Sequence, residues 1–178
     1  KIDDIEKIIV HFRPFHALRF GEQDIQIIKN IPCTHNIPYN LTMAALKISP
    51  NSKWHAKENT ENSKVKQLMK KIFTVPSGEA LVIGVEDIKK CGFPKRIFSR
   101  VDIFYKGKIY SKSNDRVKGD PWWKETKFTD NDLKNKFETC AEGILDNKKI
   151  SQVIDKIMNL EEIEDISEIT ELLIKKER

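Results

Sequence analysis

The hydrophobic periodicity of this chain changes near Thr129, and that change restricts the possible folds more than any other feature. Before it, runs rich in β-branched and aromatic residues, such as residues 5–12, alternate with short helical patterns. After it, apolar residues recur only every three or four positions, as in amphipathic helices. The sequence therefore predicts an α+β fold. We expect an antiparallel-rich sheet with helices packed on it over residues 1–128, followed by C-terminal α-helices over residues 129–178.

Local signals predict the individual elements. Lys106-Gly107 is a short glycine-containing connection that predicts a hairpin, and Pro38 stands where the first turn of a helix accepts proline. Thr129 and Asp132 form a capping pair for the first C-terminal helix. The expected strands are residues 5–12, 80–85, 100–105 and 108–113, and the expected helices are residues 36–47, 63–72, 129–144, 150–157 and 166–173. Residues 114–128, with turn signals and two adjacent tryptophans, are expected to form a structured loop.

Composition places the chain among globular proteins, because 39% of its 178 residues are hydrophobic and 33% are charged. No apolar run approaches the roughly 20 residues that a membrane span needs, and no basic start leads into an apolar stretch as in a signal peptide. We therefore expect a cytoplasmic protein that does not engage a membrane. Cys33, Cys91 and Cys140 are odd in number and widely spaced, which argues against a disulfide framework and a four-cysteine zinc site.

Positive charge is concentrated in the middle of the chain. The net charge is +5, and residues 61–128 hold 16 basic and 8 acidic side chains, whereas residues 129–178 hold 8 and 13. A basic segment raises nucleic acid as a partner. Around residues 64–71, however, the aromatic side chains that binders of single-stranded nucleic acid interleave with their lysines are missing. We therefore interpret these lysines as a solvated helix face and do not expect nucleic acid as a partner.

The sequence carries no motif for a nucleotide cofactor: no phosphate-binding glycine loop, no dinucleotide fingerprint and no Gly-x-Ser-x-Gly. We therefore expect no cofactor. The histidines at positions 11, 16, 35 and 55 show no helical metal-ligand spacing. Cys33 and His35 come nearest to a ligand pair, but two ligands are too few for structural zinc, so we expect no metal. We assign His11 to a strand and His35 to the cap of the helix that follows it.

Tyr39 is the side chain whose position is most suggestive of chemistry. It stands at the opening of a predicted helix, directly after Pro38, where a phenol could project from the helix end into a cleft. Physical reasoning alone favours a packed tyrosine over that interpretation. Trp122 and Trp123 could stack on a ligand, but a loop anchored by a large apolar side chain is the commoner arrangement.

Four segments, taken in order, resemble one known family. Residues 5–10 look like a strand of its lid domain, and residues 36–44 look like its Ser-x-x-Tyr-x-x-Ala helix start, with Asn36 in place of serine. Residues 118–137, which begin Lys-Gly-Asp-Pro-Trp, and residues 159–169 are similar to its C-terminal stretch and closing helices. The chain therefore resembles the MmgE/PrpD family, which includes 2-methylcitrate dehydratase, cis-aconitate decarboxylase and iminodisuccinate epimerase.

The resemblance implies both an architecture and a chemistry. Family members have a large helical domain, built from the N-terminal half and the last helices, and an α+β lid that closes over a cleft between the two. The implied activity is that of a cofactor-free lyase or isomerase, a dehydratase, decarboxylase or epimerase, which moves a proton beside a carboxylate of a small di- or tricarboxylate. Most catalytic residues of the family lie in the helical domain and just upstream of residue 1. We therefore expect the N-terminal helical half, in the same or a separate chain, as a partner, and a homo-oligomer.

Within this chain the resemblance points to Tyr39 as the catalytic residue, donating a proton or hydrogen bond to the substrate as the lid closes. His35, near it, is a weaker candidate for substrate binding. The alternative from another functional class is a non-catalytic binding module, or an inactive remnant. Such a protein would keep the lid fold and use its basic face for nucleic acid or protein.

Overall fold

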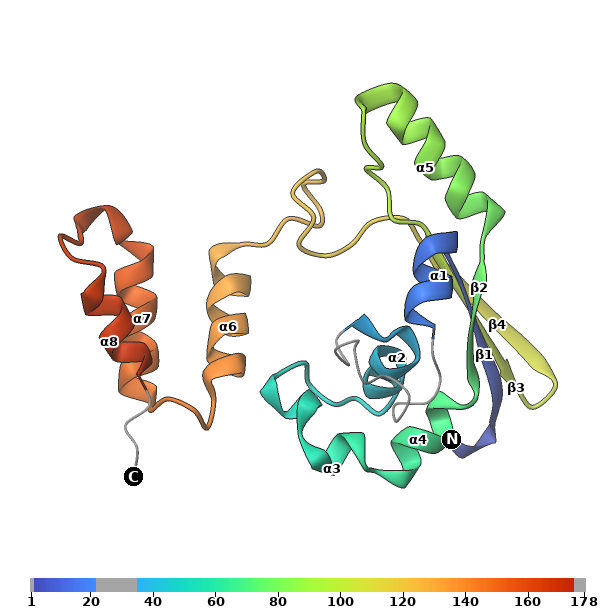
Figure 1. Ribbon diagram of the computed structural model, residues 1–178, viewed down its shortest axis with the longest axis horizontal. Coiled ribbons are helices and arrows are strands. Elements are labelled where there is room, and N and C mark those ends of the chain that lie inside the picture. The colour runs from blue at the N-terminus through green and yellow to red at the C-terminus, as the bar shows by residue number, and fades with distance from the viewer. Residues whose placement is uncertain (1, 22–34, 175–178) are drawn as a thin grey trace. The chain divides into compact units, whose positions relative to one another are not determined.

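The computed structural model describes residues 2–21 and 35–174 (Figure 1). The chain divides into two compact units, one of Lys1–Ser49 with Lys53–Lys127 and one of Pro50–Ser52 with Phe128–Arg178. The first unit contains the strands and the second is helical. That the two units are separate domains remains a prediction.

The first unit is built on a four-stranded sheet with the strand order β2-β1-β3-β4. Its strands are β1 (Ile5–Phe12), β2 (Ile72–Pro76), β3 (Ser99–Tyr105) and β4 (Lys108–Asn114). β1 pairs in parallel with β2 and antiparallel with β3, and β3 pairs antiparallel with β4. The predicted α+β fold with an antiparallel-rich sheet is confirmed.

The predicted hairpin joins β3 to β4 through Lys106 and Gly107. Both residues have positive φ, 49° and 70°, as a two-residue type I′ turn requires. This turn brings Lys108 opposite Tyr105 and starts the antiparallel pairing. β4 is exposed along its whole length, and the lysines on it discourage pairing with a further strand.

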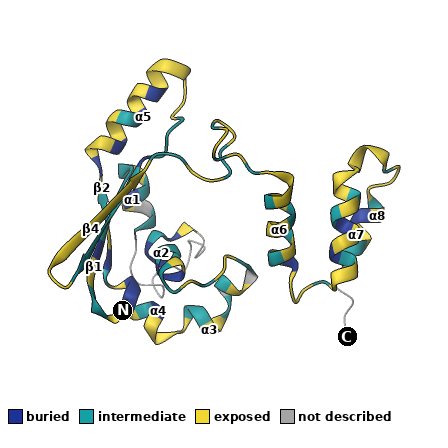
Figure 2. Cartoon of the chain, turned by 180° about the vertical axis from the view of Figure 1, so that it is seen from behind, coloured by how far each residue is buried: buried dark blue, intermediate teal, exposed yellow. Residues whose placement is uncertain are grey.

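The core of the first unit lies on one face of this sheet. Ile8 and Val10 alternate with exposed or partly exposed neighbours along β1, and each is 4% exposed. Figure 2 shows the chain coloured by burial class. They pack with Leu68 and Ile72. Two helices lie against this face, α2 (Ile37–Ala45) and α4 (Ser63–Met69). A second buried cluster between these helices contains Tyr39, Met43, Val65 and Met69.

The described part of the first unit contains three further α-helices: α1 (Pro14–Phe20), α3 (Lys57–Thr60) and α5 (Gly78–Cys91). Short 3-10 helices are formed by Ile2–Asp4 (η1) and Ser52–His55 (η3). α1 lies along β2, where the hydroxyl of Thr74 donates a hydrogen bond of 2.9 Å to the carbonyl of Ala17. Proline in the first turn of α1 fits because its missing N–H would have no helical partner there.

Residues 80–85 were predicted to form a strand, and this prediction is wrong, because they belong to α5. The hydroxyl of Ser77 accepts a hydrogen bond from the backbone N–H of Ala80, which starts the helix, and Gly92 ends it at φ 82°. A short apolar run has no periodicity that separates a strand from a helix, so these two caps decide its structure.

The helix predicted over residues 63–72 is shorter than expected. Asn62 caps α4, and the helix ends at Met69. Ile72 starts β2 instead, because it pairs with Ile8 of β1. This pairing with a distant strand overrides the local helical spacing. β2 and α1 were not predicted from the sequence.

The second unit contains the three predicted C-terminal helices, α6 (Asp130–Ala141), α7 (Asn147–Met158) and α8 (Ser167–Leu173), with a 3-10 turn at Leu160–Glu162. The predicted capping box is present, since Thr129 and Asp132 exchange side-chain to backbone hydrogen bonds. Buried apolar residues on the last two helices are Ile150, Val153 and Ile169. Among residues 2–21 and 35–174, no helix has the length and apolar character needed to cross a membrane.

Candidate functional site

Tyr39 lies in the first turn of α2, and its side chain is fully enclosed. The side-chain oxygen of Asn36 caps the helix by accepting a 2.7 Å hydrogen bond from the backbone N–H of Tyr39. The tyrosine is 0% exposed, and its ring meets the indole of Trp54 edge to face at a centroid distance of 6.5 Å. Its hydroxyl donates a hydrogen bond to the backbone carbonyl of Trp54. In this structure Tyr39 is a packed residue whose phenol does not reach solvent.

His35 precedes α2 and is exposed. The cap of that helix is the side chain of Asn36, so the expectation that His35 caps it is wrong. An Asn side chain reaches the N–H group three residues ahead, which is the usual capping geometry. The imidazole of His35 lies instead 5.9 Å from the ring of Phe20.

A row of aromatic and imidazole rings leads from α1 to His35. Phe12 and His16 lie 5.5 Å apart, His16 and Phe20 lie 5.8 Å apart, and Phe20 contacts His35. Burial, and next the positive charge of Arg13, lower the pKa of His16. The interval of four residues between His16 and Phe20 within α1 is one that a sequence pattern could have indicated.

The segment around Trp122 and Trp123 is a closed loop, as predicted. The backbone N–H of Gly119 donates to the carbonyl of Thr126 at 2.6 Å, and the Asp120 side chain accepts from the N–H of Trp122 at 3.1 Å. Trp122 is 51% exposed and its ring lies 4.8 Å from that of Phe93.

Two positively charged side chains lie close to the indole ring of Trp123. Lys95 Nζ and Arg116 Cζ each lie 4.2 Å from the ring centroid. Arg116 also pairs with Glu125 at 3.5 Å. This arrangement anchors the loop through cation–π contacts.

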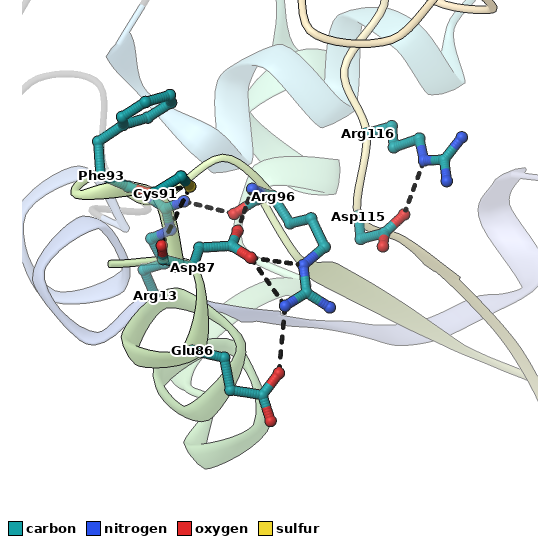
Figure 3. Close-up of polar contacts among 8 residues, drawn as sticks. All are labelled: Arg13, Glu86, Asp87, Cys91, Phe93, Arg96, Asp115 and Arg116. Atoms are coloured by element: carbon teal, nitrogen blue, oxygen red, sulfur yellow. Dashed lines mark hydrogen bonds and ion pairs between the residues drawn. The ribbon is translucent and has the colours of Figure 1, made fainter. Parts of the chain in front are cut away.

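Asp87 ties the end of α5 to the segment before β3 (Figure 3). Its carboxylate is 6% exposed and accepts hydrogen bonds from the backbone N–H and the Nε of Arg96, at 2.5 and 2.9 Å. The bond from the Arg96 side chain is the main cause that lowers the pKa of Asp87. Arg96 also pairs with Glu86 at 3.1 Å, and its carbonyl accepts from Arg13 Nη2 at 2.6 Å. These two arginines therefore have structural partners.

A second polar network lies on the sheet face opposite Ile8 and Val10. His11 Nε2 is 2.7 Å from Asp102 Oδ2 and 3.1 Å from Arg100 Nη2. A hydrogen bond with Ser111 is the largest cause that lowers the pKa of Asp102, and His11 and Arg100 lower it further. One ring nitrogen cannot both donate to the carboxylate and accept from the guanidinium, so the tautomer of His11 selects one partner. The assignment of His11 to a strand is confirmed; its two partners were not predicted.

One hollow in the first unit has a volume of about 500 Å³ and is lined partly by lysines. Its lining residues are Ile2, Asp3, Leu46, Lys64, Gln67, Leu68 and Lys71. Lys71 Nζ donates to the carbonyls of Ile5 and Asp3, at 2.6 and 3.2 Å, so its charge has partners. Neither Tyr39 nor His35 lines this hollow.

No three His, Cys, Asp or Glu side chains gather to hold a metal ion within the two described stretches of the chain. Cys33, which was considered together with His35, lies outside the described residues. The absence of a metal and of a cofactor stays a prediction.

The comparison with known families decides the assignment. A family model described as the MmgE/PrpD C-terminal domain matches residues 1–160. The chain belongs to the MmgE/PrpD family. No curated protein matches it. The match confirms the family resemblance and covers the first three of the four sequence segments, including α2 with Tyr39 and the Trp122–Trp123 loop of this MmgE/PrpD domain. The fourth segment, residues 159–169, lies almost entirely beyond the matched range.

Proposed function

We propose that this MmgE/PrpD domain is the lid of a cofactor-free lyase or isomerase acting on a small di- or tricarboxylate. The match to the family's C-terminal domain over residues 1–160 is the observation that carries the proposal. The reaction is a dehydration, decarboxylation or epimerisation in which a proton moves beside a carboxylate. The substrate's negative charge fits a chain whose residues 61–128 hold twice as many basic as acidic side chains.

The catalytic site is completed by an N-terminal helical domain, in the same or a separate chain. A domain that the family places at the C-terminus implies a domain before it. Exposed apolar side chains in the second unit support such a partner. Leu133 of α6, Ile157 of α7 and Ile166 before α8 are 51%, 49% and 62% exposed, and helices of this kind are stable when another layer covers them.

Tyr39 donates a proton or a hydrogen bond to the substrate when the lid closes. Because its hydroxyl now bonds the Trp54 carbonyl, this role requires η3, which carries Trp54, to move away from α2. His35 is exposed at the entrance to the same helix and serves as a secondary contact for a substrate carboxylate.

The alternative of a nucleic-acid-binding module has less support. Binders of single strands stack bases on aromatic rings, and the Trp123 ring already carries two cations from its own unit. Asp87 and Glu86 further neutralise Arg96 within the basic segment.

Co-expression with the coding sequence directly upstream tests the proposal. We expect the two chains to co-purify and to convert methylcitrate, cis-aconitate or iminodisuccinate. Co-purification with no turnover of these acids would count against a lyase or isomerase. If the chain is folded but binds no N-terminal domain, the assignment of this chain as the lid of a larger enzyme is wrong.

A further inference from the structure

Arg13 carries a positive charge that no carboxylate balances within the described part of the chain. Its Nη2 donates a hydrogen bond of 2.6 Å to the backbone carbonyl of Arg96, and its Nε is enclosed with no partner among the described residues. Arg96 differs, because Asp87 and Glu86 pair with it at 2.8 and 3.1 Å (Figure 3). A partly buried guanidinium without a counter-charge is unfavourable, since burial removes part of its hydration. Arg13 therefore has the properties of a group that binds an anion.

His16 offers a hydrogen-bond donor beside this guanidinium. Arg13 is the N-cap residue of α1 and His16 is the third residue of the helix, so both side chains lie at the same helix end. Nδ1 of His16 is enclosed and bonds no described residue. A proton there would be buried without an acceptor, so the proton of the uncharged ring is on Nε2. Burial, and next the charge of Arg13, lower the pKa of His16, which favours the uncharged ring.

Aromatic rings surround the donor on His16. The rings of Phe12 and Phe15 meet it edge to face at centroid distances of 5.5 and 5.6 Å. Phe20 lies 5.8 Å from His16 and 5.9 Å from His35, so its ring contacts both imidazoles. Apolar walls strengthen the attraction between a cation and an anion, because they exclude water from around the pair. The two donors thus lie near the residue already proposed to contact a substrate carboxylate.

We propose that Arg13 and His16 form a binding site for a carboxylate group of a small di- or tricarboxylate. The guanidinium pairs with the carboxylate, and Nε2 of His16 donates to one of its oxygens. A phosphate fits less well, because it brings more oxygens and more negative charge than one guanidinium and one uncharged N–H can match. That the ligand is the substrate rests on the proposed lyase or isomerase function, whereas the carboxylate site itself does not.

Binding of tricarballylate to the 178-residue chain tests the site. This saturated tricarboxylate has no hydroxyl group, double bond or chiral centre, so none of the proposed reactions consumes it. We expect it to shift the ring signals of His16 in NMR spectra, and we expect inorganic phosphate at equal concentration and ionic strength to shift them much less. Calorimetric titration measures the affinity of each variant.

Arg13→Gln should weaken tricarballylate binding by about tenfold or more, because the charge is lost. Arg13→Lys keeps the charge without the planar fork and should bind with intermediate affinity. His16→Phe keeps the ring contacts and should weaken binding only by about a few-fold. Arg100→Gln is the matched control, because Arg100 is a partly exposed arginine of the same unit that pairs with Asp102 at 3.4 Å. It should leave the affinity unchanged. Circular dichroism checks that each variant is folded.

The proposal is overturned if the His16 signals do not respond to tricarballylate, or if Arg13→Gln binds as tightly as the wild type. Equal binding of phosphate overturns the assignment to carboxylates. The complete enzyme separates this inference from the proposed function. There, Arg13→Gln should raise KM more than it lowers kcat. Turnover with an unchanged KM in this variant would support the lyase or isomerase function and exclude the Arg13 site as the substrate site. Binding by a wild type that converts none of the acids would keep the carboxylate site and contradict the proposed function.

Discussion

Gly21 lies directly after α1 in a space too small for any side chain. A Cβ atom there would stand 1.9 Å from Thr74 Oγ1 and 2.4 Å from the carbonyl oxygen of Ala17. Because Thr74 donates its hydrogen bond to that carbonyl, both atoms would have to move. Gly21→Ala should lower the free energy of unfolding by about 1–3 kcal/mol, measured by urea denaturation.

Gly84 is the matched control for this substitution. It lies in the interior of α5, and a Cβ atom there meets nothing within 4 Å. Gly84→Ala should raise the free energy of unfolding by about 0.5–1 kcal/mol, because alanine loses less backbone entropy in a helix. Equal effects of the two substitutions would contradict the close contact at Gly21.

Tyr39 forms a hydrogen bond in this structure and has a proposed catalytic role. The variant Tyr39→Phe tests the two separately, through the free energy of unfolding and through kcat. Loss of the bond to the Trp54 carbonyl should cost about 1 kcal/mol of unfolding free energy. In the complete enzyme, loss of the acid should lower kcat by about 100-fold or more. Turnover at the wild-type rate, together with the stability loss, would show that Tyr39 only packs. His35→Ala should have a smaller effect on kcat and only a small effect on the free energy of unfolding, because His35 is exposed.

At the scale of elements, α5 is held to the rest of its unit through Asp87. The ordinary pKa of this carboxyl is 3.8, and the hydrogen bond from Arg96 lowers its pKa in the folded state. A lowered pKa means that the carboxylate contributes stability above the ordinary value and loses it as pH falls through the folded value. At neutral pH, Asp87→Asn should therefore cost about 2 kcal/mol of unfolding free energy.

The pH dependence of the free energy of unfolding distinguishes the contribution of the Asp87–Arg96 ion pair from that of apolar packing. On acidification from neutral pH to below about 4, the wild type should lose more stability than Asp87→Asn, because the variant has no carboxylate to protonate. Urea unfolding at both pH values measures the difference. Glu86→Gln is the control. The Glu86 side chain is 50% exposed, so removing its charge should change little. Identical pH profiles for wild type and Asp87→Asn would contradict the role of Asp87.

At the scale of the whole molecule, the nature of the partner determines how binding responds to salt. Docking of apolar helix faces, such as those bearing Ile157 and Ile166, should change little as ionic strength rises. Binding of nucleic acid through several phosphates should weaken by orders of magnitude. We expect a pull-down with the N-terminal helical domain to survive high salt. A complex that dissociates steeply with salt would favour the binding-module alternative.

The sequence by itself determined the elements whose signals are local. The Lys106-Gly107 turn, the Thr129 and Asp132 capping box and the C-terminal helices follow from residues a few positions apart, so they were predicted correctly. The family resemblance likewise needed only the order of short segments. Tyr39 was placed at a helix start for the same reason, because Asn36 and Pro38 are its neighbours.

Only the tertiary structure decided the features that join distant segments. Ile72 is in a strand because it pairs with Ile8, against its local helical spacing. His11 meets Asp102 across two strands, and the Tyr39 hydroxyl bonds a carbonyl fifteen residues away. Such contacts depend on how the chain closes its loops and buries its apolar faces, and no short window of sequence contains that information.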